Sequence, residues 1–139
     1  MNTKVFSPEL RGHLQEFDPV RLTAEVIETG ETWADRDAAA SALEEARKTI
    51  LAELTLEYIA VAAVESSGGD AKATRTGMPA SRAEMKALAD PRYKEHLSQM
   101  VLRRKDANRA RVRYDMGRMK LELMRSLQST LRNEMYLNR

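Results

Sequence analysis

Apolar side chains recur at helical intervals over much of the 139-residue chain. The pattern is clearest from about residue 31 to residue 66, where apolar positions are separated by three, four or seven residues. These positions are Leu43, Ile50, Leu54, Val61 and Val64. Such spacing places the side chains on one face of an α-helix. The opposite surface of this helix carries glutamates, and the pattern as a whole predicts an all-α chain.

Prolines and glycines indicate where the helices of the N-terminal half begin and end. Ser7-Pro8 predicts a short helix over about 8–16, because a cap residue followed by proline is typical of a helix start. Asp18-Pro19 repeats this signal and predicts a second helix, which Gly30 is expected to end or bend. The long helix over 31–66 would then follow.

The C-terminal half carries similar signals. Residues 67–80 have the composition of a flexible basic loop. Ser81-Arg82-Ala83-Glu84 reads as a capping box that opens a short helix to Ala89. Asp90-Pro91 then begins a last helix that extends to about Leu137. We therefore expect one all-helical domain, with an acidic half over 1–66 and a basic half over 81–139.

The last predicted helix has apolar side chains on two sides. One stripe, called the seam, has the a/d spacing of a coiled coil. The seam consists of Met100, Ala107, Ala110, Tyr114, Gly117, Leu121, Met124, Gln128, Leu131 and Met135. A second stripe, called the outer stripe, lies about 200° away at about 100° per residue. The outer stripe consists of Val112, Met116, Met119, Leu123 and Leu127.

A helix that is apolar on two sides must be covered on both sides. The helix over 31–66 can cover one of them, so we expect a homo-oligomer, either a bundle or a ring with coiled-coil-like packing. The alternative is an intramolecular bundle with a broad buried face. The residues expected to mediate oligomerisation are Tyr114, Met116, Gly117, Met119, Leu121, Leu123, Met124, Leu127, Leu131 and Met135.

Charge is distributed unevenly along the chain. The net charge is only +2, but residues 1–70 carry 14 acidic and 6 basic residues, whereas residues 71–139 carry 7 acidic and 17 basic residues. Five arginines also recur at intervals of seven and share one side of the last helix. This arginine row consists of Arg104, Arg111, Arg118, Arg125 and Arg132.

Two interpretations of the basic half remain open. Its arginines either pair with carboxylates of the acidic helix or of another subunit, or they contact the phosphates of a polyanion. The candidate nucleic-acid-binding residues are the bases of the loop and of the last helix. They are Lys72, Arg75, Arg103, Arg104, Lys105, Arg109, Arg111, Arg113, Arg118 and Lys120.

Motifs for covalent chemistry are missing from the sequence. The chain has no cysteine, its histidines (His13 and His96) lack patterned acidic partners and are expected to be solvated, and Gly68-Gly69 is not followed by the Lys-Ser/Thr of a phosphate loop. We therefore expect no enzyme, no cofactor and no metal site. No apolar run approaches the ~20 residues of a membrane span, so we expect a cytoplasmic protein.

Several short motifs occur in an order that is found in a known family. Asp18, Arg21, Leu22 and Glu25 precede Trp33, which opens the long helix; Tyr58, the loop over 66–70, Glu84-Met85-Lys86 and Asp90 follow. This order resembles the UvsY-type recombination mediator proteins of tailed bacteriophages. The resemblance implies an all-helical ring that binds single-stranded DNA and helps to load a recombinase onto strands coated by a single-strand-binding protein.

One departure from the family affects the expected DNA site. The family has a short basic motif near the end of its first long helix, but this chain has no basic residue from Ala52 to Asp70. The DNA contacts are therefore expected at the loop and the last helix. The alternative function is a non-enzymatic coiled-coil adaptor, in which the methionine-rich outer stripe binds a partner helix during phage assembly or host-defence inhibition.

Overall fold

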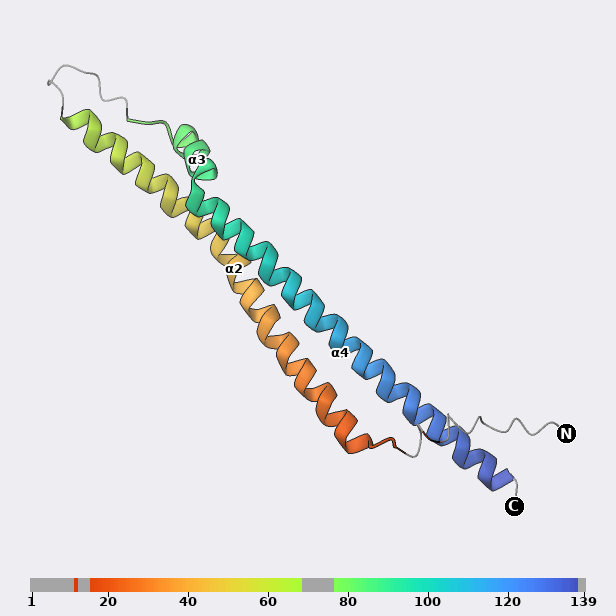
Figure 1. Cartoon of the computed structure of the whole chain (residues 1–139). Coiled ribbons are helices and arrows are strands. Elements are labelled where there is room, and N and C mark those ends of the chain that lie inside the picture. The colour runs from red at the N-terminus through yellow and green to blue at the C-terminus, as the bar shows by residue number, and fades with distance from the viewer. Residues whose placement is uncertain (1–11, 13–15, 69–76, 138–139) are drawn as a thin grey trace. The chain divides into compact units, whose positions relative to one another are not determined.

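The structure is a computed structural model that describes residue 12, residues 16–68 and residues 77–137. The labelled helices are α2 (Pro19–Ser67), α3 (Ala80–Ala89) and α4 (Pro91–Leu137), as Figure 1 shows. The described residues contain no strand, so the all-α prediction is confirmed for them. The helix expected over 8–16 falls almost entirely outside the described residues, as do the loop bases Lys72 and Arg75.

The helices contribute to two compact units. Of the described residues, those up to Asp35 and from Asn108 onward belong to the first unit, and those between Arg36 and Ala107 belong to the second unit. Both α2 and α4 therefore supply one segment to each unit, whereas α3 belongs to the second unit alone.

The start of α2 is capped as the sequence predicts. Asp18 Oδ1 accepts hydrogen bonds from the backbone N–H groups of Val20 (2.9 Å) and Arg21 (3.2 Å), which otherwise have no partner in the first turn. The prediction that Gly30 ends or bends this helix is wrong, because α2 is continuous through it. A Cβ at Gly30 would lie 3.1 Å from Cε2 of Tyr114. Gly30 therefore provides space for a ring of α4 rather than a helix break.

The two helices after the loop begin differently. The predicted capping box at Ser81 is wrong, since α3 begins at Ala80 after Pro79 and has no side-chain cap. The Pro79 carbonyl accepts the N–H groups of Arg82 (3.0 Å) and Ala83 (3.1 Å), so the first turn starts too early for Ser81 to act as the cap. The start of α4 predicted at Asp90-Pro91 is confirmed, because α4 begins at Pro91.

The core of the second unit lies where α2, α3 and the start of α4 meet. Leu54, Ala87 and Tyr93 are buried together there, with four partly buried apolar side chains around them: Ile50, Leu51, Tyr58 and Leu97. The prediction that the apolar face of α2 is buried is correct at Leu54 but wrong near the C-terminal end of the helix. Val61 and Val64 are 49% and 72% exposed because no described residue covers them.

The core of the first unit is formed by α2 and α4 at close range. Ala110 and Leu121 of the seam are buried, and a Cβ at Gly117 would lie 3.3 Å from Cγ2 of Val26. The seam therefore faces α2 of the same chain. The contact between the seam and α2 does not reach the end of α4, because Met135, the last residue of the seam, is 64% exposed.

Candidate nucleic-acid interface

The arginine row of α4 divides into residues with different surroundings. Arg104 forms ion pairs within the second unit, from Nη1 to Asp37 Oδ1 (2.6 Å) and from Nη2 to Glu44 Oε2 (2.8 Å). Its Nε also donates to Glu44 Oε1 at 2.8 Å. These hydrogen bonds lower the pKa of Glu44 and raise that of Arg104. Of the two interpretations of the basic half, Arg104 therefore follows the first, because it pairs with carboxylates of the acidic helix α2.

Arg111 and Arg118, in the first unit, have weaker acidic partners. Their closest carboxylate oxygens belong to Asp115 (3.8 Å) and Glu122 (3.6 Å), each one turn further along α4. All four side chains are more than half exposed, and exposed pairs of this kind contribute about 0.3–0.5 kcal/mol. Both guanidinium groups remain largely available to another anion.

Five other predicted binding residues of α4 are exposed and have no ion pair or side-chain hydrogen bond among the described residues. They are Arg103, Lys105, Arg109, Arg113 and Lys120. The first two belong to the second unit, and the other three belong to the first unit. In the first unit, residues 109–120 contain five basic residues and one acidic residue, a balance of +4. The excess lies on α4 itself; on the α2 side, Glu25 and Glu28 line the same hollow as Arg113, but neither forms an ion pair with it.

The outer stripe is uncovered in the described chain. Val112, Met116, Met119 and Leu123 are 57–68% exposed, and only Leu127 is partly buried. By contrast, Tyr114 and Gly117 of the seam contact α2. Of the residues expected to mediate oligomerisation, Met116, Met119 and Leu123 of the outer stripe and Met135 of the seam are thus exposed in the described chain.

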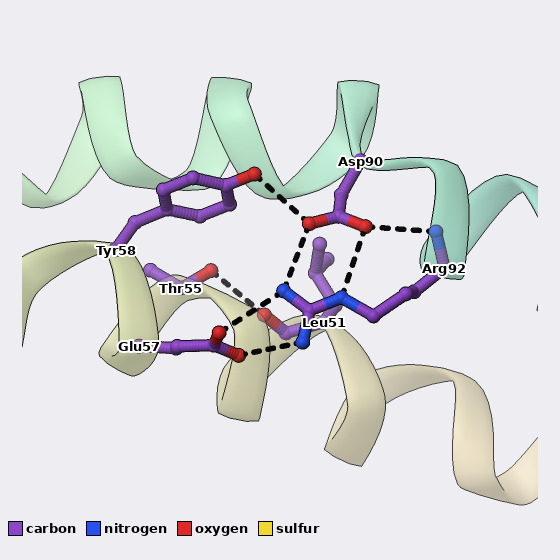
Figure 2. Close-up of polar contacts among 6 residues, drawn as sticks. All are labelled: Leu51, Thr55, Glu57, Tyr58, Asp90 and Arg92. Atoms are coloured by element: carbon purple, nitrogen blue, oxygen red, sulfur yellow. Dashed lines mark hydrogen bonds and ion pairs between the residues drawn. The ribbon is translucent and has the colours of Figure 1, made fainter. Parts of the chain in front are cut away.

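A polar network that the sequence analysis missed joins α2 to the start of α4 in the second unit (Figure 2). The Tyr58 hydroxyl donates to Asp90 Oδ2 at 2.9 Å, and the Arg92 guanidinium donates to both oxygens of Asp90, at 3.2 Å and 3.0 Å. Arg92 also donates to both oxygens of Glu57, at 2.9 Å and 3.2 Å. The Arg92 backbone N–H donates to Asp90 Oδ1 at 2.7 Å, so Asp90 is also the cap of α4.

The network explains why a carboxylate is buried at this corner. Asp90 is only 5% exposed, and an unpaired carboxylate there would be strongly unfavourable. The hydrogen bonds from Arg92, with that from Tyr58, lower the pKa of Asp90 to about 2. The same bond to Asp90 raises the pKa of Tyr58. These groups satisfy one another's hydrogen-bonding and charge requirements, so we assign the network a structural role: it holds α2 against the start of α4.

His96 has a structural contact rather than the solvated position expected from sequence. It is partly buried, and its Nε2–H donates to the Leu43 carbonyl at 2.8 Å. Across the described parts of the chain, no three acidic, histidine or cysteine side chains are grouped so that they could hold a metal ion. None of the helices in those parts is long and apolar enough to cross a membrane.

No protein family matches the chain, and neither a curated protein nor a solved structure is significantly similar to it.

Proposed function

We propose that the protein binds single-stranded DNA through the exposed bases of α4 and acts as an accessory factor that helps to load a recombinase. The observation that carries the proposal is a group of bases in the first unit: Arg109, Arg113 and Lys120 are exposed and form no ion pair among the described residues. Solubility alone does not require five bases and one acid within twelve residues.

Electrostatic contact of this kind is independent of base sequence. Each phosphate that a basic side chain neutralises releases a counterion, so affinity falls as the salt concentration rises. A single chain offers few such contacts. In a homo-oligomer, one strand would contact the bases of several subunits, and this multivalency would raise the effective affinity. The exposed outer stripe supports association between copies.

The mediator role is drawn from the resemblance to the UvsY-type proteins. A recombinase and a single-strand-binding protein are the partners that this role implies. The binding step can be tested without either of them, and it should be tested first.

The experiment is a fluorescence anisotropy titration of a labelled single strand at several salt concentrations, with a matched duplex for comparison. The test variant is Arg109→Gln/Arg113→Gln. The control is Arg47→Gln/Lys48→Gln, which removes the same charge from an exposed part of α2. We expect the test variant to bind more weakly and to lower the slope of log affinity against log salt by about 1.4, since each single-strand phosphate contact contributes about 0.7. Equal slopes for both variants would contradict the proposal.

A second candidate function is a protein-binding adaptor, and the exposure of the outer stripe favours it. Methionine side chains adjust to differently shaped partners, and Met116 and Met119 are 66% and 68% exposed. An adaptor would keep the same hydrodynamic size when single-stranded DNA is added, whereas the DNA-binding protein would form a larger complex. Size-exclusion chromatography with light scattering separates these outcomes.

A further inference from the structure

Four side chains of the first unit form a cluster around two stacked aromatic rings. The rings of Trp33 and Tyr114 lie 5.4 Å apart between centroids, with an angle of 27° between their planes. The guanidinium of Arg111 lies 5.7 Å from the Trp33 ring centroid, and that of Arg118 lies 5.8 Å from the Tyr114 ring centroid. We call these four residues the aromatic ladder. The two stacked rings form its centre, and each ring has one guanidinium over it.

The centre of the ladder is fixed by close packing. Gly30 leaves room for the Tyr114 ring, because a Cβ there would lie 3.1 Å and 3.3 Å from two ring carbons. Trp33 and Tyr114 are partly exposed residues rather than fully buried ones. The tyrosine is therefore held against α2 without being sealed from solvent.

The two ends of the ladder are held loosely. The Arg111 and Arg118 side chains are 64% and 53% exposed, and their carboxylate partners are at 3.8 Å and 3.6 Å. Both guanidinium groups lie near the outer limit of about 6 Å for a cation–π contact. An exposed contact of this type is weaker than the stacking of a nucleobase on an aromatic ring. A base can therefore replace a guanidinium on a ring, and the released guanidinium can pair with the adjoining phosphate.

From this geometry we infer that the aromatic ladder is a stacking site for the bases of a single strand. A flat, partly exposed aromatic surface flanked by two cations suits a nucleobase and its phosphates, and stacking tolerates any base because every base has a π-face. The bases of a duplex are already stacked on each other. The ladder thus supplies a preference for single strands that phosphate contacts alone do not provide.

This inference rests on the proposed function, and the experiment separates the two. Trp33 is the only tryptophan, so its fluorescence reports on the ladder directly. The unmodified protein is titrated with oligothymidine and with an abasic strand of the same length, while anisotropy of labelled strands measures binding in parallel. We expect oligothymidine to quench Trp33 fluorescence and the abasic strand to bind without quenching it. We also expect the abasic strand to bind at least about 5-fold more weakly.

Two variants extend the test to the residues. Tyr114→Leu should weaken oligothymidine binding by at least about 5-fold and leave abasic-strand binding unchanged. Trp33→Phe keeps a ring in place and should cause a smaller loss. Tyr136→Leu is the matched control, because Tyr136 is 75% exposed near the end of α4 and has no stacked partner among the described residues. Circular dichroism establishes that each variant is folded.

The outcomes distinguish the two proposals. Equal quenching by both strands would show that Trp33 responds to phosphate, which overturns the stacking site but retains DNA binding. Binding of oligothymidine without quenching would show that no base stacks on Trp33, which also overturns the stacking site but retains DNA binding. If neither strand binds, the proposed function and the stacking site both fail.

Discussion

Gly30→Ala tests the close contact on which the aromatic ladder depends. In the interior of an exposed helix, replacing glycine by alanine stabilises by about 1 kcal/mol, because alanine restricts the unfolded chain and is the best helix former. At Gly30 the added Cβ would lie 3.1 Å from Cε2 and 3.3 Å from Cδ2 of Tyr114. These distances are shorter than ordinary van der Waals contact, so the ring must shift.

The steric cost should exceed the gain in helix propensity. Forcing an extra carbon into a well-packed position costs about 1–3 kcal/mol, and both contacted atoms belong to a rigid ring that also stacks on Trp33. We therefore expect Gly30→Ala to destabilise the protein by about 1 kcal/mol. In a Tyr114→Ala background the obstacle is gone, and the same substitution should stabilise by about 1 kcal/mol. The coupling between the two positions would be about 2 kcal/mol.

The assay is urea unfolding followed by circular dichroism at one fixed protein concentration. Gly117→Ala serves as a control on α4, because the single neighbouring atom there is a methyl carbon of Val26 at 3.3 Å. Its effect should be close to zero and independent of Tyr114. If Gly30→Ala stabilised the protein equally with and without the Tyr114 ring, the reasoning about the ladder would be refuted.

Three further predictions concern the second unit. Leu54→Ala should lower the free energy of unfolding by about 2–4 kcal/mol in urea titrations, because Leu54 is 5% exposed in the core; a loss below about 1 kcal/mol would contradict its burial. The lowered pKa of Asp90 means that its contribution to stability is complete above the ordinary pKa of 3.8 and is lost as the pH falls toward about 2. Asp90→Asn should therefore have a flatter melting temperature between pH 5 and pH 2 than the unmodified protein, and parallel curves would argue against the pairing with Arg92. Arg104→Gln should lower the melting temperature but leave the salt slope of DNA binding unchanged, because Arg104 already pairs with Glu44; a reduced slope would place Arg104 at the DNA.

Much of the fold could be predicted from local signals. The Asp-Pro steps at 18–19 and 90–91 mark helix starts, since the aspartate side chain caps the backbone and proline fits the first helical position. The glycine signal failed at residue 30 because glycine allows a helix break but does not impose one. The reason for a glycine at residue 30 is its contact with the ring of Tyr114, which lies 84 residues further along the chain.

The site was less predictable, because long-range contacts decide which charges are free. The seven-residue interval places the arginine row on one side of α4, but it does not show that Arg104 meets Glu44 while Arg111 lies over Trp33. The bond between Tyr58 and Asp90 spans 32 residues and has no local signature. From sequence, Tyr114 is expected in the seam and among the oligomerising residues, whereas in the structure it stacks on Trp33 of the same chain, a contact that depends on how α2 and α4 pair.

The small size of the core residues has a consequence for how the protein responds to its own concentration. Five of the eight buried apolar residues in the described parts of the chain are alanines: Ala40, Ala83, Ala87, Ala107 and Ala110. Alanine removes little apolar surface from water, so folding of one chain contributes a modest hydrophobic free energy, while the larger side chains of the outer stripe still face solvent. A molecule that covers the outer stripe of the folded chain stabilises the folded state by mass action and therefore raises the melting temperature. A melting temperature that rises with protein concentration would identify a second copy as that cover, and one that is constant until a partner is added would identify a different molecule.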